Sequence, residues 1–145
     1  MRMTLAVVLL GLLIPAFIGS ASEGKPAQQP VKIAFSEDDF RNDQPHKTKE
    51  VTLKSGDTLI VELGSNPTTG FSWNEQAVNS DMAVLKQVHH ERVSPKAKRP
   101  GAGGSQEWTF EAVKPGTATL NFSYGRPWEG GEKGTWTLKV VVKIQ

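Results

Sequence analysis

The sequence predicts an all-β fold, a two-layer sandwich of about seven or eight antiparallel strands. Short segments of alternating apolar and polar residues lie between turn signals such as Lys54-Ser55-Gly56-Asp57 and Lys114-Pro115-Gly116. No segment sustains the i, i+3, i+4 apolar spacing of a long helix. With 145 residues, the chain can build one two-layer core but not a second.

The predicted strands follow one another from Val31. Val31–Phe35 starts the folded part, and Glu50–Leu53 follows a polar stretch at Ser36–Pro45. These two pieces can form one edge strand that is split by a bulge or a crossover. The other strands are expected at Asp57–Leu63, Gly70–Glu75, Val84–Val93, Gln106–Val113, Thr117–Tyr124 and Gly134–Ile144.

Alternation is clearest in the last two of these strands. One face of Thr117–Tyr124 is expected to be core, and it consists of Ala118, Leu120, Phe122 and Tyr124. The apolar face of Gly134–Ile144 consists of Trp136, Leu138, Val140, Val142 and Ile144.

Residues 1–21 have the features of a secretory signal peptide. Arg2 supplies the positive start, Leu5–Ile18 the apolar stretch, and Gly19-Ser20-Ala21 a cleavage site of small residues. This leader predicts export, either to a periplasm or out of the cell.

A retained membrane anchor is the alternative to cleavage. Gly11 and Pro15 interrupt the apolar run, which is short for a bilayer core of about 30 Å, so cleavage is favoured. Residues 22–30 are small, polar and rich in turn formers, and they are expected to form a flexible linker. The folded domain is then expected to span residues 31–145.

Composition excludes several classes of function. The formal net charge of +2 argues against nucleic acid as the main partner. Because the chain has no cysteine, it can have neither a disulfide framework nor a thiol nucleophile. The densest basic patch is either a solvated loop or a surface that attracts an acidic partner, and it consists of Arg92, Lys96, Lys98 and Arg99.

Neither an enzyme nor a metal site is expected. The chain lacks a G-x-S-x-G turn, and its only histidines are His46, His89 and His90. Neighbouring residues of a strand point to opposite faces, so His90 is expected in solvent and His89 packed or at an edge. Glu37-Asp38-Asp39 lacks the ligand spacing of a calcium loop. No cofactor is predicted.

Three unusual loops are expected at one end of the sandwich. If consecutive strands are antiparallel, every second connection falls on the same end. The first, third and fifth connections after Asp57 contain Asn66-Pro67-Thr68-Thr69-Gly70, Gly101-Ala102-Gly103-Gly104 and Arg126-Pro127-Trp128.

The first loop is expected to be a stiff, narrow wedge. Pro67 fixes φ near −65° and makes Asn66 extended, and Gly70 allows a backbone geometry that other residues resist. Thr68 and Thr69 would place small hydroxyls at the tip, suited to hydrogen bonds inside a cleft.

The glycine-rich loop precedes a strand rather than a helix, so a phosphate-binding loop is excluded. Its residues can expose backbone groups for pairing with another chain, or they can form a mere linker.

Arg126-Pro127-Trp128 indicates a binding hot spot, since tryptophan and arginine dominate such sites. Trp128 lies outside any strand alternation and is expected to be exposed. The tryptophans expected in the core are Trp73, Trp108 and Trp136.

Together, the motifs N-P-T-T-G, G-x-G-G and R-P-W, in this order, resemble the chagasin family of cysteine peptidase inhibitors over about Val31–Gln145. The resemblance implies an immunoglobulin-like sandwich that binds papain-like peptidases, such as papain or cathepsin L-like enzymes, tightly and reversibly. It implies that Asn66–Gly70 lies against the catalytic cysteine and histidine, while Gly101–Gly104 and Arg126–Trp128 grip either side.

The alternative function is an immunoglobulin-like adhesion module that uses Trp128 to bind another ligand, such as a sugar or a surface protein. A monomer is expected in either case.

Overall fold

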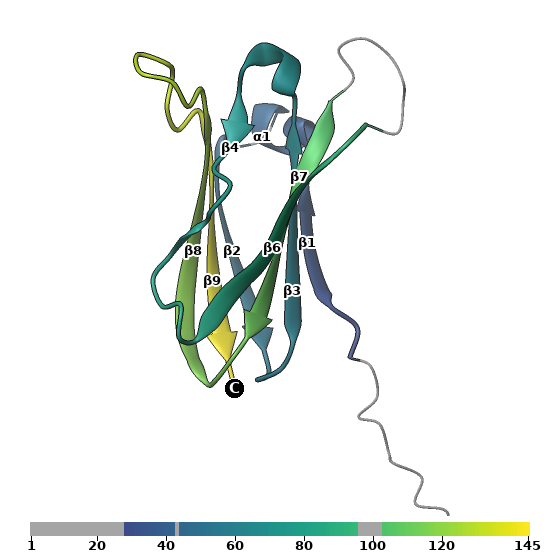
Figure 1. Cartoon of the computed structure of the whole chain (residues 1–145), viewed down its shortest axis with the longest axis vertical. Helices are drawn as coiled ribbons and strands as arrows, with labels where there is room; N and C mark the ends of the chain where they lie inside the picture. The colour runs from purple at the N-terminus through teal and green to yellow at the C-terminus, as the bar shows by residue number, and fades with distance from the viewer. Residues whose placement is uncertain (1–27, 43, 96–102) are drawn as a thin grey trace, which may run out of the picture.

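The computed structural model describes residues 28–42, 44–95 and 103–145 and consists of two β-sheets packed face to face (Figure 1). Sheet A has the strand order β1-β3-β7-β6, and sheet B has the order β2-β9-β8-β4, with β5 also paired to β8. The strands of sheet A are β1 (Val31–Phe35), β3 (Thr58–Ser65), β7 (Gly104–Ala112) and β6 (Leu85–Val93). Those of sheet B are β2 (His46–Leu53), β9 (Trp136–Ile144), β8 (Gly116–Gly125), β4 (Ser72–Trp73) and β5 (Val78–Asn79).

The predicted all-β sandwich is confirmed, but the prediction that all its strands are antiparallel is wrong for two edge strands. β1 pairs with β3 in parallel, and β2 pairs with β9 in parallel. The physical reason is that β1 and β2 lie in different sheets, so neither is the hairpin partner of the other. The crossover alternative for the first edge strand is therefore the right one.

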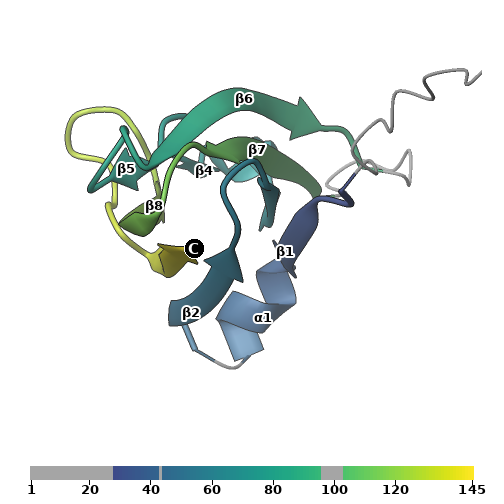
Figure 2. The same cartoon turned by 90° about the horizontal axis from the view of Figure 1, so that it is seen from below.

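The crossover contains a short helix that the sequence did not indicate, α1 (Glu37–Asn42). Ser36 caps it: its Oγ accepts from the Asp39 backbone N–H at 3.3 Å, and the Asp39 carboxylate accepts from the Ser36 N–H at 2.6 Å. The hydrogen bonds that the Asp39 carboxylate accepts from the Ser36 N–H and hydroxyl lower the pKa of Asp39. Seen from below, α1 lies beside β1 and β2 (Figure 2).

The helix contributes one large side chain to the core. Phe40 is 1% exposed, and its ring lies 5.1 Å from that of Trp73 and 5.6 Å from that of Trp136. Phe40 also contacts Phe35 of β1 at 5.9 Å, so it joins both sheets.

The inner faces of the two sheets carry the residues predicted for the core. The apolar faces of β8 and β9 are buried as expected, except that Trp136 is only partly buried. Across the sandwich, Phe122 of β8 packs edge-on against Trp108 of β7 at 4.9 Å and against Phe110 at 6.2 Å.

Among the described residues, no helix is long and apolar enough to cross a membrane.

We expect Phe122→Ala to lower the free energy of unfolding by about 3–5 kcal/mol, because it removes a buried ring and leaves a cavity between the sheets. Urea denaturation would measure the loss. Val113→Ala, at a side chain that is 50% exposed, is the control and should change stability by less than about 0.5 kcal/mol. Equal losses for the two variants would show that Phe122 is not a core residue.

Candidate functional site

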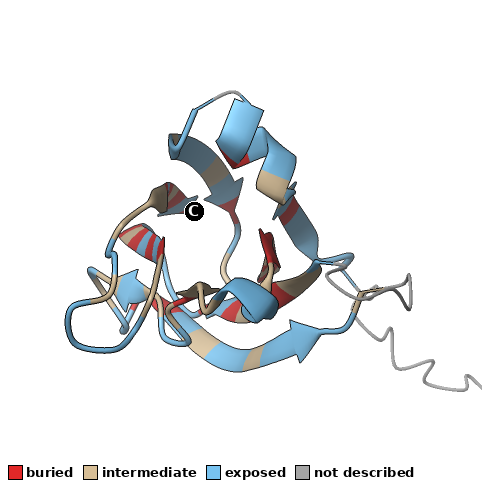
Figure 3. Cartoon of the chain, turned by 90° about the horizontal axis from the view of Figure 1, so that it is seen from above, coloured by how far each residue is buried: buried red, intermediate tan, exposed pale blue. Residues whose placement is uncertain are grey.

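The first and third unusual loops lie at one end of the sandwich, here called the rim, and so do Gly103 and Gly104, the described residues of the second loop (Figure 1). The three loops connect β3 to β4, β6 to β7, and β8 to β9. Strand register holds them together, because Ser65 at the end of β3 pairs with Gly104 and Ser72 of β4 pairs with Gly125. Seen from above, the wedge is mostly exposed, while most buried residues lie on the strands (Figure 3).

A fourth element also reaches the rim, and strand counting from Asp57 left this element out. Because β1 runs parallel to β3, the crossover helix α1 begins at the same end. A Cβ added to Gly64 would lie 2.5 Å from the Glu37 backbone nitrogen, and one added to Gly103 would lie 2.6 Å from a Glu37 carboxylate oxygen. Glu37 therefore lies between the base of the first loop and the end of the second.

The first loop, hereafter the wedge (Asn66–Gly70), is a single turn of 3-10 helix, η1 (Pro67–Thr69), capped at both ends. Asn66 is extended, with φ −118°, and its side chain accepts from the Thr68 backbone N–H at 3.2 Å. Gly70 has φ +78°, and its N–H donates to the Pro67 carbonyl at 3.1 Å. The predicted roles of Pro67 and Gly70 in stiffening the backbone are consistent with this geometry.

Both threonine hydroxyls donate hydrogen bonds within the wedge. Thr68 Oγ1 donates to Asn66 Oδ1 at 2.6 Å, and Thr69 Oγ1 donates to the Asn66 carbonyl at 2.7 Å. Thr69 Oγ1 also accepts from the Phe71 N–H at 3.4 Å. The hydroxyls thus brace the wedge, and their remaining lone pairs can accept hydrogen bonds from a partner.

Two core residues hold the first end of the wedge, at Asn66 and just before it. The Asn66 backbone N–H donates to the Tyr124 hydroxyl at 3.2 Å, and the Trp73 indole N–H donates to the Gly64 carbonyl at 2.9 Å. Tyr124 and Trp73 are both buried. Sequence patterning placed both side chains in the core but could not show that their polar ends reach the wedge.

The third loop contacts the wedge through Arg126. Its Nη2 donates to the Thr69 carbonyl at 3.4 Å, and its guanidinium carbon lies 4.5 Å from the centre of the Phe71 ring. Arg126 is therefore turned toward the neighbouring loop.

Trp128 is 52% exposed, as expected for a residue outside the strands. Its ring covers Gly70, since a Cβ on Gly70 would lie 2.5 Å from Trp128 Cη2. The Lys133 ammonium donates to the carbonyls of both Arg126 and Trp128, the latter at 2.6 Å, and this closes the loop. Nothing in the R-P-W motif indicates the role of Lys133.

Much of the second loop lies outside the described residues, including Gly101 and Ala102 as well as the basic residues Lys96, Lys98 and Arg99. Gly104 begins β7, and a side chain there would collide with the Val93 carbonyl. Arg92, the described member of the basic patch, forms an ion pair with Glu75 at 3.6 Å.

The predicted orientation of the two neighbouring histidines is wrong. His89 is exposed, whereas His90 is half-buried, with its ring 5.2 Å from that of Trp108. The register of β6 shifts between Gln87 and His89, and this bulge at Val88 reverses which residues face inward. Among the described residues, no group of three or more potential ligands could hold a metal ion.

The motifs and the fold agree with comparisons to known proteins. A family model described as "Chagasin family peptidase inhibitor I42" matches residues 52–140. The chain belongs to the chagasin family. Chagasin of Trypanosoma cruzi is 30% identical over 103 residues, which cover 68% of this chain and 91% of that protein. Amoebiasin-2 of Entamoeba histolytica is 26% identical over 102 residues, which cover 70% of this chain and 80% of that protein.

Two solved structures share the sandwich. The cysteine protease inhibitor EhICP2 from Entamoeba histolytica has a TM-score of 0.60 and 22% identity, over 81% of this chain and 99% of that one. PbICP-C, solved in complex with falcipain-2, has a TM-score of 0.57 and 14% identity, over 79% of this chain and 99% of that one. At these identities the likeness shows the fold.

We expect Gly70→Ala to destabilise this chagasin-family domain more than Gly130→Ala does. Both glycines have nearly the same positive φ, +78° and +77°, so each variant pays a similar backbone cost of about 1–2 kcal/mol. Only at Gly70 would the new Cβ also meet Trp128, since nothing lies within 4 Å of a Cβ on Gly130. Urea denaturation would measure the difference, and equal losses would contradict the contact between Gly70 and Trp128.

Proposed function

We propose that the protein is a reversible, competitive inhibitor of papain-like cysteine peptidases. In this proposal the wedge enters the active-site cleft, while the Gly101–Gly104 and Arg126–Trp128 loops grip either side. The observation that supports it most is the contact between two motifs that are far apart in the sequence. At the rim, Arg126 and Trp128 pack directly on the wedge.

The rim is built to bind at low entropic cost. The wedge is braced by its own hydrogen bonds, and its neighbours hold it from the core and from the third loop. A loop that is already in one conformation loses little freedom on binding, so more of the contact energy appears as affinity. Trp128, half of whose surface is exposed, supplies the large aromatic anchor typical of such interfaces.

The experiment that tests this proposal is a titration of the chain from Ser22 onward against papain and a cathepsin L-like peptidase, using a fluorogenic substrate. Trypsin is the control enzyme. Competitive and reversible inhibition of the cysteine peptidases alone would support the proposal. No inhibition at micromolar concentration would favour the adhesion module.

Export and boundaries belong to the same proposal. Cleavage near residue 21 would release a linker at 22–30 and an inhibitor domain at 31–145, acting as a monomer in the periplasm or outside the cell. Residues 1–27 lie outside the described part of the chain, so this prediction rests on the sequence alone.

We expect the wedge to survive prolonged contact with the peptidase. A peptidase needs its scissile carbonyl aligned in an extended segment, whereas the wedge is a closed turn with hydrogen bonds from Thr69 N to Asn66 O and from Gly70 N to Pro67 O. Intact-mass analysis after incubation with excess papain should show no cleavage within Asn66–Gly70. Cleavage there would mean that the wedge binds as a substrate.

We expect Trp128→Ala to weaken inhibition by about 2 kcal/mol or more, which is about 30-fold in the inhibition constant. Thermal stability should scarcely change, because the ring is half exposed. Met82→Ala, a 75% exposed side chain next to β6 at the end opposite the rim, is the control and should leave inhibition unchanged. A loss of stability that matches the loss of binding would assign Trp128 a purely structural role. Shortening Gly101–Gly104 should cost less affinity than Trp128→Ala, unless this loop pairs with the peptidase through its backbone.

A further inference from the structure

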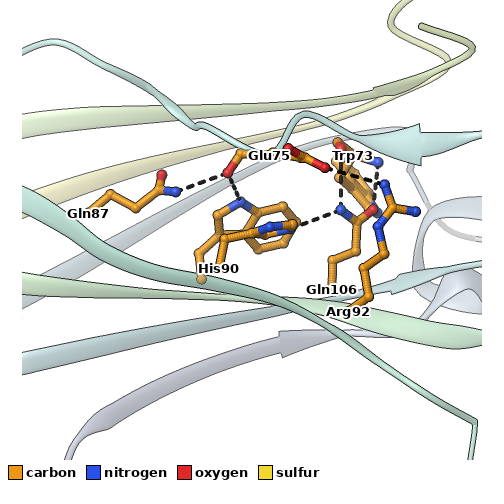
Figure 4. Close-up of polar contacts among 7 residues, drawn as sticks. Trp73, Glu75, Gln87, His90, Arg92 and Gln106 are labelled. Carbon is orange, nitrogen blue, oxygen red and sulfur yellow. Dashed lines mark hydrogen bonds and ion pairs between the residues drawn. The ribbon is translucent and has the colours of Figure 1, made fainter.

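Side chains of β6 and β7 close one open side of the sandwich, between β6 and the segment that runs from β4 to β5. Gln87 spans the gap to this segment, donating to the Glu75 carbonyl at 2.9 Å and accepting from the Ala77 N–H at 3.1 Å. The Trp108 indole donates to the same Glu75 carbonyl at 2.9 Å. Figure 4 shows the hydrogen bond from Gln87 to the Glu75 carbonyl together with those that join Gln106 to Trp73 and His90.

Gln106 bridges the gap nearest to the wedge. It is only 1% exposed, and its amide takes the place of a strand partner for Trp73. Gln106 Oε1 accepts from the Trp73 N–H at 2.8 Å, while Nε2 donates to the Trp73 carbonyl at 3.3 Å. β4 is thereby tied to sheet A as well as to its neighbour β8 in sheet B.

His90 is the hydrogen-bond partner of the second N–H of the Gln106 side-chain amide. The two Nε2 atoms lie 3.1 Å apart. The Trp73 N–H fixes which end of the Gln106 amide is the oxygen, so the amide nitrogen must donate and His90 Nε2 must accept. A protonated His90 would turn an N–H toward this amide nitrogen, and the hydrogen bond would be lost.

Charged groups surround His90 on two elements. Glu75, after β4, and Glu91 favour its protonation, whereas Arg92 and His89 on β6 oppose it. β7 presents only the uncharged Gln106 and Trp108.

Burial is the largest influence, and it lowers the pKa of His90 below its ordinary value of about 6.5. A lowered pKa in the folded state means that this group stabilises the fold above about pH 6.5. The contribution is lost as the pH falls through the lower, folded-state value.

Trp73 connects this network to the wedge. β4 begins two residues after Gly70, and the Trp73 indole donates to the carbonyl of Gly64, on the other side of the wedge. A shift of Trp73 would therefore move both ends of the wedge at once.

We propose that Gln106 and His90 form a latch that positions the wedge, and that protonation of His90 releases it, so that inhibition weakens on acidification. This inference rests on the proposed function. In it, Gln106 and His90 are positioning residues and contact no peptidase.

His90→Gln tests the latch, because its side-chain oxygen can accept the same hydrogen bond but does not titrate. Inhibition constants would be measured for both proteins from pH 7.5 to 5.0 with the same peptidase. Taking their ratio at each pH cancels the enzyme's own pH dependence. The wild-type constant should rise about threefold or more relative to that of His90→Gln, since each pKa unit is worth a factor of ten.

His89→Gln is the matched control, with the same substitution at an exposed neighbour. Its ratio to wild type should stay constant with pH. In a Gln106→Met background, which lacks the donor, exchanging His90 for Gln should no longer alter the pH dependence. The latch would be overturned if the ratio of the wild-type inhibition constant to that of His90→Gln stayed constant with pH. It would also be overturned if the ratio of wild type to His89→Gln rose equally. The third contradicting result is a His90→Gln exchange that alters the pH dependence as much in the Gln106→Met background as in the wild type.

Hydrogen exchange of the Trp73 backbone amide tests the latch without relying on inhibition of a peptidase. Its protection factor should fall from pH 7.5 to 5.0 in the wild type and hold in His90→Gln. An equal change in both proteins would overturn the latch. A wild-type chain that inhibits no cysteine peptidase at any pH would instead overturn the proposed function, while the exchange data would still decide whether the latch opens.

Discussion

The buried side chain of Trp73 links the core of the sandwich to the base of the wedge. Its indole lies 5.1 Å from the rings of Phe40 and Tyr124, and its N–H donates to the Gly64 carbonyl. The Trp73 backbone forms two hydrogen bonds with the side-chain amide of Gln106 in the opposite sheet. Burying a large ring and satisfying its polar groups favours a single arrangement of the core. The wedge emerges from that arrangement, so its position follows from core packing.

The rim then combines local stiffness with support from a distance. Within the wedge, Asn66 accepts the hydrogen bonds of both threonines, so the turn is braced before any partner arrives. Arg126 joins it from the third loop, and Tyr124 supports it from below. Such support on a sandwich is how loops can carry function without an ordering cost at each binding event.

Sequence patterning succeeded where one face of a strand is buried without interruption, as in β8, whose inward residues alternate from Ala118 to Tyr124. It failed in β6, because one additional residue at Val88 reverses the alternation and turns His90 inward. It also missed α1, which is six residues long and buries only Phe40. A helix this short does not repeat its apolar spacing, so it leaves no periodic signal.

Features that depend on neighbouring residues could be predicted from the sequence alone: the faces of β8 and β9, and the order of the three motifs at alternate connections. The proline and glycine of the wedge likewise set its backbone locally. The parallel edge pairs emerged only when the chain was folded. So did the contacts of Arg126 with Thr69, Tyr124 with Asn66, and Gln106 with Trp73, which join residues 57, 58 and 33 positions apart. Such contacts follow from strand register and sheet packing, about which a local pattern of side chains carries no information.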